Sequence, residues 1–177
     1  MDSNESAQKL LPSAVVKMIA SLVTVTLVTA ACVSVNIGPK GAERSQGVEF
    51  NAPGSPYESL KETPADGAWQ NRANGNSISY FSTCNDPADP SLETVARELF
   101  AGLAEMKEVA THRGTFNGRE SLEMEVEGRV EGVLTRIRSL MFKKNGCLYT
   151  LSHIGIPKSF EQDRSRFNEF MRSFQAP

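Results

Sequence analysis

Residues 120–154 read ESLEMEVEGRVEGVLTRIRSLMFKKNGCLYTLSHI, and this stretch decides the fold that we expect. Within 120–127, three apolar residues alternate with glutamates, which is the period of two of a half-buried strand. A glycine-bounded turn leads to a second strand over 133–142. The Asn-Gly pair at 145–146 then signals a tight hairpin before a third strand over 147–154. Both faces of this last strand are apolar, so we expect it near the centre of a sheet that is covered on both sides.

Upstream of this stretch, the sequence predicts a helix over 91–106 and a weaker strand over 107–115, joined to the next strand by a turn at 116–119. Asp89 is expected to cap the helix, with Pro90 at its first position. The apolar residues of the helix recur on one face. They are Leu92, Val95, Ala96, Leu99, Phe100, Leu103 and Met106.

The region before that helix predicts short strands. They are expected over 48–50, from Trp69, and over 77–84, with an irregular, proline-rich segment over 51–67. The Asn-Gly pair at 74–75 favours a tight hairpin.

The carboxyl-terminal segment predicts a final helix over 160–174. Ser159 and Gln162 have the spacing of a capping box. The helix carries an apolar stripe that we expect to pack on the sheet rather than on a cofactor. The stripe consists of Phe160, Phe167, Phe170, Met171 and Phe174.

This order of elements predicts an α+β domain with a mainly antiparallel sheet: short strands, a helix, a four-stranded meander and a final helix. In layout, the chain from 48 to 174 resembles the Mog1/PsbP-like fold. The residues that carry the resemblance are Trp69, 78–81, 116–119, 132–133, 147–149 and the Phe-rich last helix. The resemblance implies an α/β/α layered domain, and exported bacterial members of this fold class include small lipoproteins. It also implies a protein that binds or assists a larger assembly, and it provides no catalytic residue.

The amino-terminal stretch AVVKMIASLVTVTLVTAAC, residues 14–32, has the order of a secretory signal: a positive residue, an apolar core and a small-residue cleavage site. Because a cysteine follows the small pair, it resembles the lipobox of bacterial lipoproteins. We therefore expect a signal peptide over 1–31, cleaved between Ala31 and Cys32, with Cys32 lipidated. A flexible tether over 32–47 and a single globular domain over 48–177 would follow.

Thr29 departs from the lipobox, which usually has Leu, Ile or Val at that position. Two alternatives therefore stay open: ordinary cleavage that leaves Cys32 as a free thiol, and retention of the apolar run as a membrane anchor. Val33 stands where an aspartate often retains lipoproteins at the inner membrane. The absence of an aspartate at this position favours the outer membrane, with the domain facing the periplasm or the cell exterior.

Cys84 and Cys147 are the two cysteines that remain. An even pair in an exported chain is most simply a disulfide. We expect no metal site, because the pair lacks the spacing of metal ligands. The formal net charge is −2 and there is no basic run, which argues against a nucleic-acid partner.

The sequence contains no catalytic motif and indicates no cofactor. His112 and His153 are interpreted as strand or surface histidines, and a Cys84–His153 nucleophilic pair is disfavoured by the disulfide. The row Glu123, Glu125 and Glu127 is interpreted as a solvated face whose members pair with Arg136 and Arg138 across strands. A second interpretation joins the row to Glu120 and Glu131 as an acidic docking surface.

Two functional hypotheses remain. The first is a membrane-tethered, non-enzymatic cell-envelope protein that binds a protein partner or supports an assembly. The second is a small-ligand binder, or a hydrolase with a scattered site, in which residues 51–67 line a pocket. A deep polar pocket with Tyr80, His153 or Arg119 would favour the second, and a shallow surface with an exposed patch would favour the first.

Overall fold

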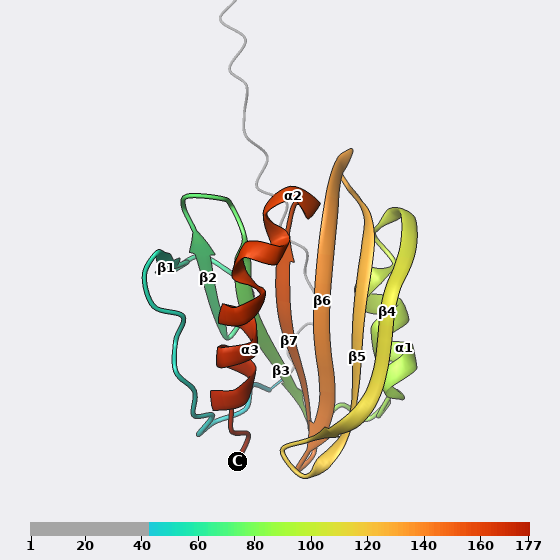
Figure 1. Cartoon of the computed structure of the whole chain (residues 1–177). Helices are drawn as coiled ribbons and strands as arrows, with labels where there is room; N and C mark the ends of the chain where they lie inside the picture. The colour runs from blue at the N-terminus through green and yellow to red at the C-terminus, as the bar shows by residue number, and fades with distance from the viewer. Residues whose placement is uncertain (1–42) are drawn as a thin grey trace, which may run out of the picture. The chain divides into compact units, whose positions relative to one another are not determined.

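The structure is a computed structural model that describes residues 43–177. It contains one antiparallel sheet in the order β1-β2-β3-β7-β6-β5-β4 (Figure 1). The strands are β1 (Tyr57–Ser59), β2 (Gly67–Asn71), β3 (Ser77–Cys84), β4 (Ala104–Phe116), β5 (Arg119–Val130), β6 (Val133–Lys144) and β7 (Cys147–Gly155). β7 is the central strand of this order, which confirms the position predicted for the last strand.

Helices cover opposite faces of the sheet, so the α/β/α prediction is confirmed. One face, here the α3 face, carries α2 (Pro157–Phe160), the 3-10 turn η1 (Glu161–Asp163) and α3 (Arg164–Ser173). The other, the α1 face, carries α1 (Leu92–Phe100). Because side chains alternate along each strand, the sheet contributes to two separate cores. The α3-face core is rich in aromatic side chains, and the α1-face core is mostly aliphatic.

Three two-residue turns connect the four-stranded meander. Asn117-Gly118 joins β4 to β5, Glu131-Gly132 joins β5 to β6, and Asn145-Gly146 joins β6 to β7. All six residues have φ between 49° and 83°. This is the left-handed region that two-residue hairpin turns require and that Asn and Gly adopt most readily. The middle turn is shorter than the predicted 128–132, because β5 continues to Val130.

Helix α1 is shorter than the apolar spacing predicts. Its cap is Ser91, whose hydroxyl accepts a hydrogen bond from the Thr94 N–H, so the predicted Asp89 cap is wrong. The helix ends at Phe100. Leu103 still packs against the α1-face core from the following loop, whereas Met106 lies on β4 with 48% of its surface exposed. Spacing alone did not reveal that the chain changes from helix to strand here.

The predicted capping box is also wrong. Pro157 begins α2 directly after Ile156, and η1 separates α2 from α3, so the expected single helix is divided. Ser159 lies inside α2, where its hydroxyl donates to Asn76 Oδ1 at 3.0 Å. The prediction that the Phe-rich stripe packs on the sheet is confirmed: Phe167, Phe170, Met171 and Phe174 belong to the α3-face core.

The first part of the domain differs in detail from the prediction. The strand expected over 48–50 is a single bridge between Glu49 and Gln175, and β1 lies within the segment expected to be irregular. The β2–β3 hairpin closes through residues 72–76 rather than through a two-residue turn. Its conformation is held by Asp163, whose carboxylate accepts hydrogen bonds from the amides of Asn74 and Asn76 at 2.8 Å.

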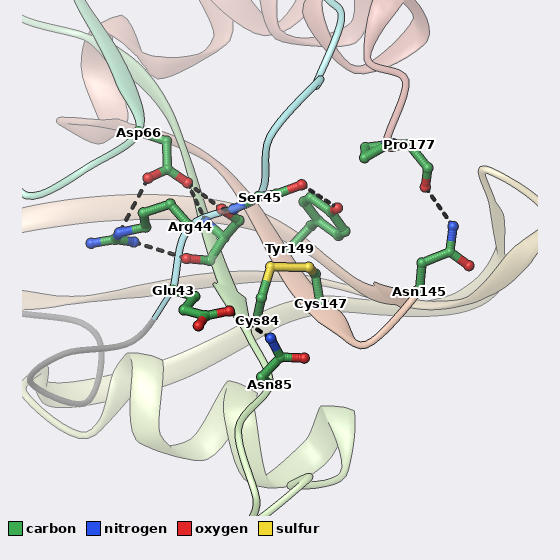
Figure 2. The surroundings of a disulfide bond; sticks show 11 residues. Glu43, Arg44, Ser45, Asp66, Cys84, Asn85, Asn145, Cys147, Tyr149 and Pro177 are labelled. Atoms are coloured by element: carbon green, nitrogen blue, oxygen red, sulfur yellow. Dashed lines mark hydrogen bonds and ion pairs between the residues drawn. A yellow bond between two sulfur atoms is a disulfide. The ribbon is translucent and has the colours of Figure 1, made fainter.

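Cys84 and Cys147 form a disulfide between β3 and β7, where the two residues are paired in register (Figure 2). The chain before the first strand packs beside this bond. The Glu43 carbonyl accepts the Cys84 N–H at 2.9 Å, and the hydroxyls of Ser45 and Tyr149 are 2.7 Å apart. The last residues of the predicted tether, 43–47, therefore belong to the packed domain.

The remaining amino-terminal predictions lie outside the described residues. They are the signal peptide over 1–31, the cleavage between Ala31 and Cys32, the lipidation of Cys32 and the tether as far as residue 42. Within residues 43–177, the structure has no helix of the length and apolar character needed to cross a bilayer.

Candidate functional site

The glutamate row lies on the α3 face of β5 and is bound by arginines. Arg136 Nε donates to Glu127 at 2.7 Å, and Arg138 donates to Glu123, which confirms the predicted cross-strand ion pairs.

The prediction that this face is solvated is wrong. Glu125 is only 7% exposed, and it contacts Arg164 at the start of α3 at 2.9 Å. The row therefore offers neither free catalytic acids nor an acidic docking surface, since its carboxylates are neutralised by arginines from β6 and α3.

The two histidines lie on strands in very different surroundings. His112 is exposed on β4. His153, on β7, is fully buried and stacks on Phe160 with ring centroids 4.2 Å apart. Neither of its ring nitrogens has a hydrogen-bond partner among residues 43–177, and burial lowers the pKa of His153 to about 4. Cys84 is bound in the disulfide, so it does not form a nucleophile with His153.

The residues named for a ligand pocket are not brought together. Arg119 lines an open hollow of about 530 Å³ beside the disulfide, with Lys143 and Asn85. Tyr80 and His153 are packed inside the domain instead. Residues 51–54 line a different open hollow, of about 480 Å³, against α3. Neither hollow is the deep polar pocket that would favour the ligand-binding hypothesis.

A mainly apolar hollow lies on the α1 face, between α1 and β4, and has a volume of about 560 Å³. We call it the α1–β4 groove. Phe100 of α1, Leu103 of the following loop and Met106 of β4 line it together with Leu122 and Met124 of β5.

The groove exists because α1 covers only part of its face. The helix packs on β5 and β6, on the side of the sheet opposite α3 (Figure 1). Residues 104–113 of the edge strand β4 are exposed. Met124 of β5 therefore remains partly exposed beside the exposed Met106 of β4, although Leu122 is buried. An open apolar surface of this kind is typical of an interaction site.

Charged residues of both signs surround the groove. Glu93 and Arg97 come from α1, and Glu108 and Arg113 come from β4. The backbone N–H of Glu93 at the helix start lowers the pKa of its carboxyl, with further lowering by Ser91 and Arg113. These carboxylates and guanidinium groups suit complementary contacts with a partner.

Within the described part of the chain, no cluster of three or more His, Cys, Asp or Glu side chains could hold a metal ion. The groove is not among the sites predicted from the sequence, although a signal was present. The weak alternation over 107–115 is what an edge strand exposed on both faces requires, because such a strand has no apolar side to bury.

Comparison with known proteins identifies the fold. No family model and no curated protein sequence matches this chain. LpqN of Mycobacterium tuberculosis, a protein involved in cell envelope biogenesis, is similar with a TM-score of 0.57 and 12% identity, over 78% of this chain and 88% of that one. The cyanobacterial PsbP (CyanoP) of Synechocystis sp. PCC 6803 is similar with a TM-score of 0.55 and 14% identity, over 80% and 95%. The described domain has the Mog1/PsbP-like fold.

Proposed function

We propose that this protein is a non-enzymatic lipoprotein of the cell envelope that binds a protein partner through the α1–β4 groove. The groove itself carries the proposal. It is open, it is lined mainly by apolar side chains, and it is surrounded by charged residues of both signs. A protein surface fits such a lining better than a small polar ligand does.

The amino-terminal sequence supports the membrane tether. Lipidation of Cys32 would leave ten residues, 33–42, before the packed chain at Glu43. Such a segment reaches at most about 35 Å when fully extended. The groove would therefore act close to the membrane surface, where envelope assemblies are built. The envelope role of LpqN supports the same location by analogy of fold.

The alternative, a small-ligand binder or scattered-site hydrolase, has less support. Residues 51–54 do line a hollow, but it is open, and the hydroxyl that faces it, that of Ser173, donates a hydrogen bond to the Phe170 carbonyl at 2.9 Å. We therefore prefer the partner-binding role.

The test is site-specific photo-cross-linking in cells of the native host. A photoreactive residue replaces Met106 in the groove. The control replaces Lys61, an exposed residue just after β1 at the opposite edge of the sheet. We expect a discrete protein adduct in the membrane fraction from position 106 only. Ala101→Arg, which fills the groove from an exposed position, should remove this adduct. Equal adducts from both positions, or an adduct that survives Ala101→Arg, would contradict the proposal.

A further inference from the structure

β4 presents a regular, unpaired strand edge. Among residues 43–177, it is the last strand of the sheet and pairs only with β5. Register shifts between Ala104 and Lys107 and between Glu108 and Ala110 interrupt its first half. From Ala110 to Phe116 the pairing is continuous. We call these seven residues the β4 edge segment. Bulges usually protect an edge from added strands, so their restriction to the first half leaves this segment as the accessible part.

The backbone of the β4 edge segment has groups available for a further strand. Phe116 and Arg119 flank the two-residue turn, so they form a hydrogen-bonded pair. Hydrogen-bonded and non-hydrogen-bonded pairs alternate in an antiparallel ladder. Thr111, Arg113 and Thr115 therefore direct their N–H and C=O groups toward the free edge.

A hollow lies beside the segment on each face of the sheet. On the α1 face, Thr111 and Arg113 line the α1–β4 groove. On the α3 face, His112 and Phe116 line a second hollow of about 340 Å³, with Met171 and Arg172 of α3. Successive side chains of a strand point to opposite faces. An added strand would thus direct its side chains alternately toward the two hollows.

The charge of the segment indicates what such a strand should carry. The segment contains the cationic Arg113, the hydrogen-bonding side chain of His112 and no carboxylate, and the cationic Arg172 lies across the α3-face hollow. Arg113 contacts Glu93 and Glu120, both of which are largely exposed. In the α3-face hollow, Glu123 is already bound by Arg138.

We propose that the β4 edge segment binds an extended acidic segment of a partner protein, which adds to the sheet as a further strand. Its carboxylates would meet His112 and Arg172 on the α3 face, and its apolar side chains would enter the α1–β4 groove. Backbone hydrogen bonds would supply affinity, and the alternating side chains would supply specificity. This inference rests on the proposed partner-binding function and specifies the chemistry of the partner.

The test uses the full protein, purified in detergent from membranes of its native host. The probe is a capped peptide of about nine residues in which valine and glutamate alternate, long enough to span the edge segment. A matched peptide alternates valine and lysine. A third probe has the acidic sequence with N-methylated backbone amides on alternate residues. It is made in two versions, one methylated at the odd-numbered residues and one at the even-numbered residues. We expect only the first peptide to bind, with about tenfold or greater loss of affinity for the other two.

Two protein variants separate edge pairing from charge attraction. Thr111→Pro removes an outward N–H without removing a hydrogen bond to β5, and Thr111→Val is its matched control because it keeps the N–H. Proline should abolish binding and valine should preserve it, with circular dichroism showing that both variants fold. Arg172→Glu provides a second test at an exposed site on the α3 face and should weaken binding about tenfold or more. Hydrogen exchange at Thr111, Arg113 and Thr115 should slow when the peptide binds.

Several results would overturn the inference. They are failure of the acidic peptide to bind, binding that tolerates N-methylation and Thr111→Pro, and self-association of the protein through the same amides. None of these would by itself remove the position-106 cross-link, so failure of this inference can be distinguished from failure of the proposed function.

Discussion

The protein should lose stability as the pH falls from about 7.5 to about 5, and replacement of His153 by phenylalanine should abolish most of this loss. His153 is fully buried against Phe160, with no hydrogen-bond partner for its ring among residues 43–177. Burial is the largest influence on its pKa. Arg138 and Arg164 also oppose protonation, while Asp163 and Glu161 favour it, and the net effect lowers the pKa to about 4.

The sign and size of the effect follow from linkage. The ordinary histidine pKa is 6.5, so the unfolded chain takes up the proton first as the pH falls. The stabilisation that His153 provides while neutral is complete above about pH 6.5, and it is lost as the pH falls toward 4. The full loss is about 3 kcal/mol, of which about 2 kcal/mol has developed at about pH 5. Phenylalanine cannot take up a proton, although its larger ring should cost about 1 kcal/mol at every pH.

Urea unfolding of the disulfide-intact protein at a series of pH values measures this effect, with the denaturant slope checked for constancy. His112→Phe is the matched control. Because His112 is exposed on β4, this variant should retain the wild-type loss of stability. If H153F loses as much stability as the wild type over this range, a different group takes up the proton and the reasoning is refuted.

Two further predictions concern the β3–β7 core. Cys84→Ser removes the disulfide to Cys147. In the chain-entropy model, this should lower the free energy of unfolding, measured with urea, by up to about 4 kcal/mol. A reduced wild-type protein that is as stable as the oxidised one would contradict this. Gly155→Ala should lower the free energy of unfolding by about 3 kcal/mol, because the added Cβ would overlap Oδ1 of the fully buried Asn76. Gly54→Ala is the control and should have little effect, because there is open space around Gly54. Equal melting temperatures of the two variants would contradict this.

The sequence predicted best where one local pattern determines one structure. The alternation over 120–127 and the Asn-Gly pair at 145–146 correctly indicated β5 and the β6–β7 hairpin, because strand period and turn conformation are local properties. The two apolar faces of 147–154 placed β7 at the centre of the sheet, since only a doubly covered strand can bury both.

Predictions failed where the outcome depends on which elements meet in space. The glutamate row has the same period whether it faces solvent or a helix, so the burial of Glu125 under Arg164 depends on how α3 packs. The spacing through Met106 matched a helical face because Leu103, although outside α1, enters the same core. The α1–β4 groove was missed for a related reason: it is formed by the place where α1 stops covering the sheet.

Membrane tethering through Cys32 is the central claim about where the protein acts. The measurement that tests it most directly is the intact mass of the protein purified from the membrane fraction of its native host, before and after reduction. We expect a chain that starts at Cys32, carries acyl groups and gains two hydrogens on reduction as the Cys84–Cys147 bond opens. An unprocessed chain, or an unacylated chain that starts at Cys32, would contradict it.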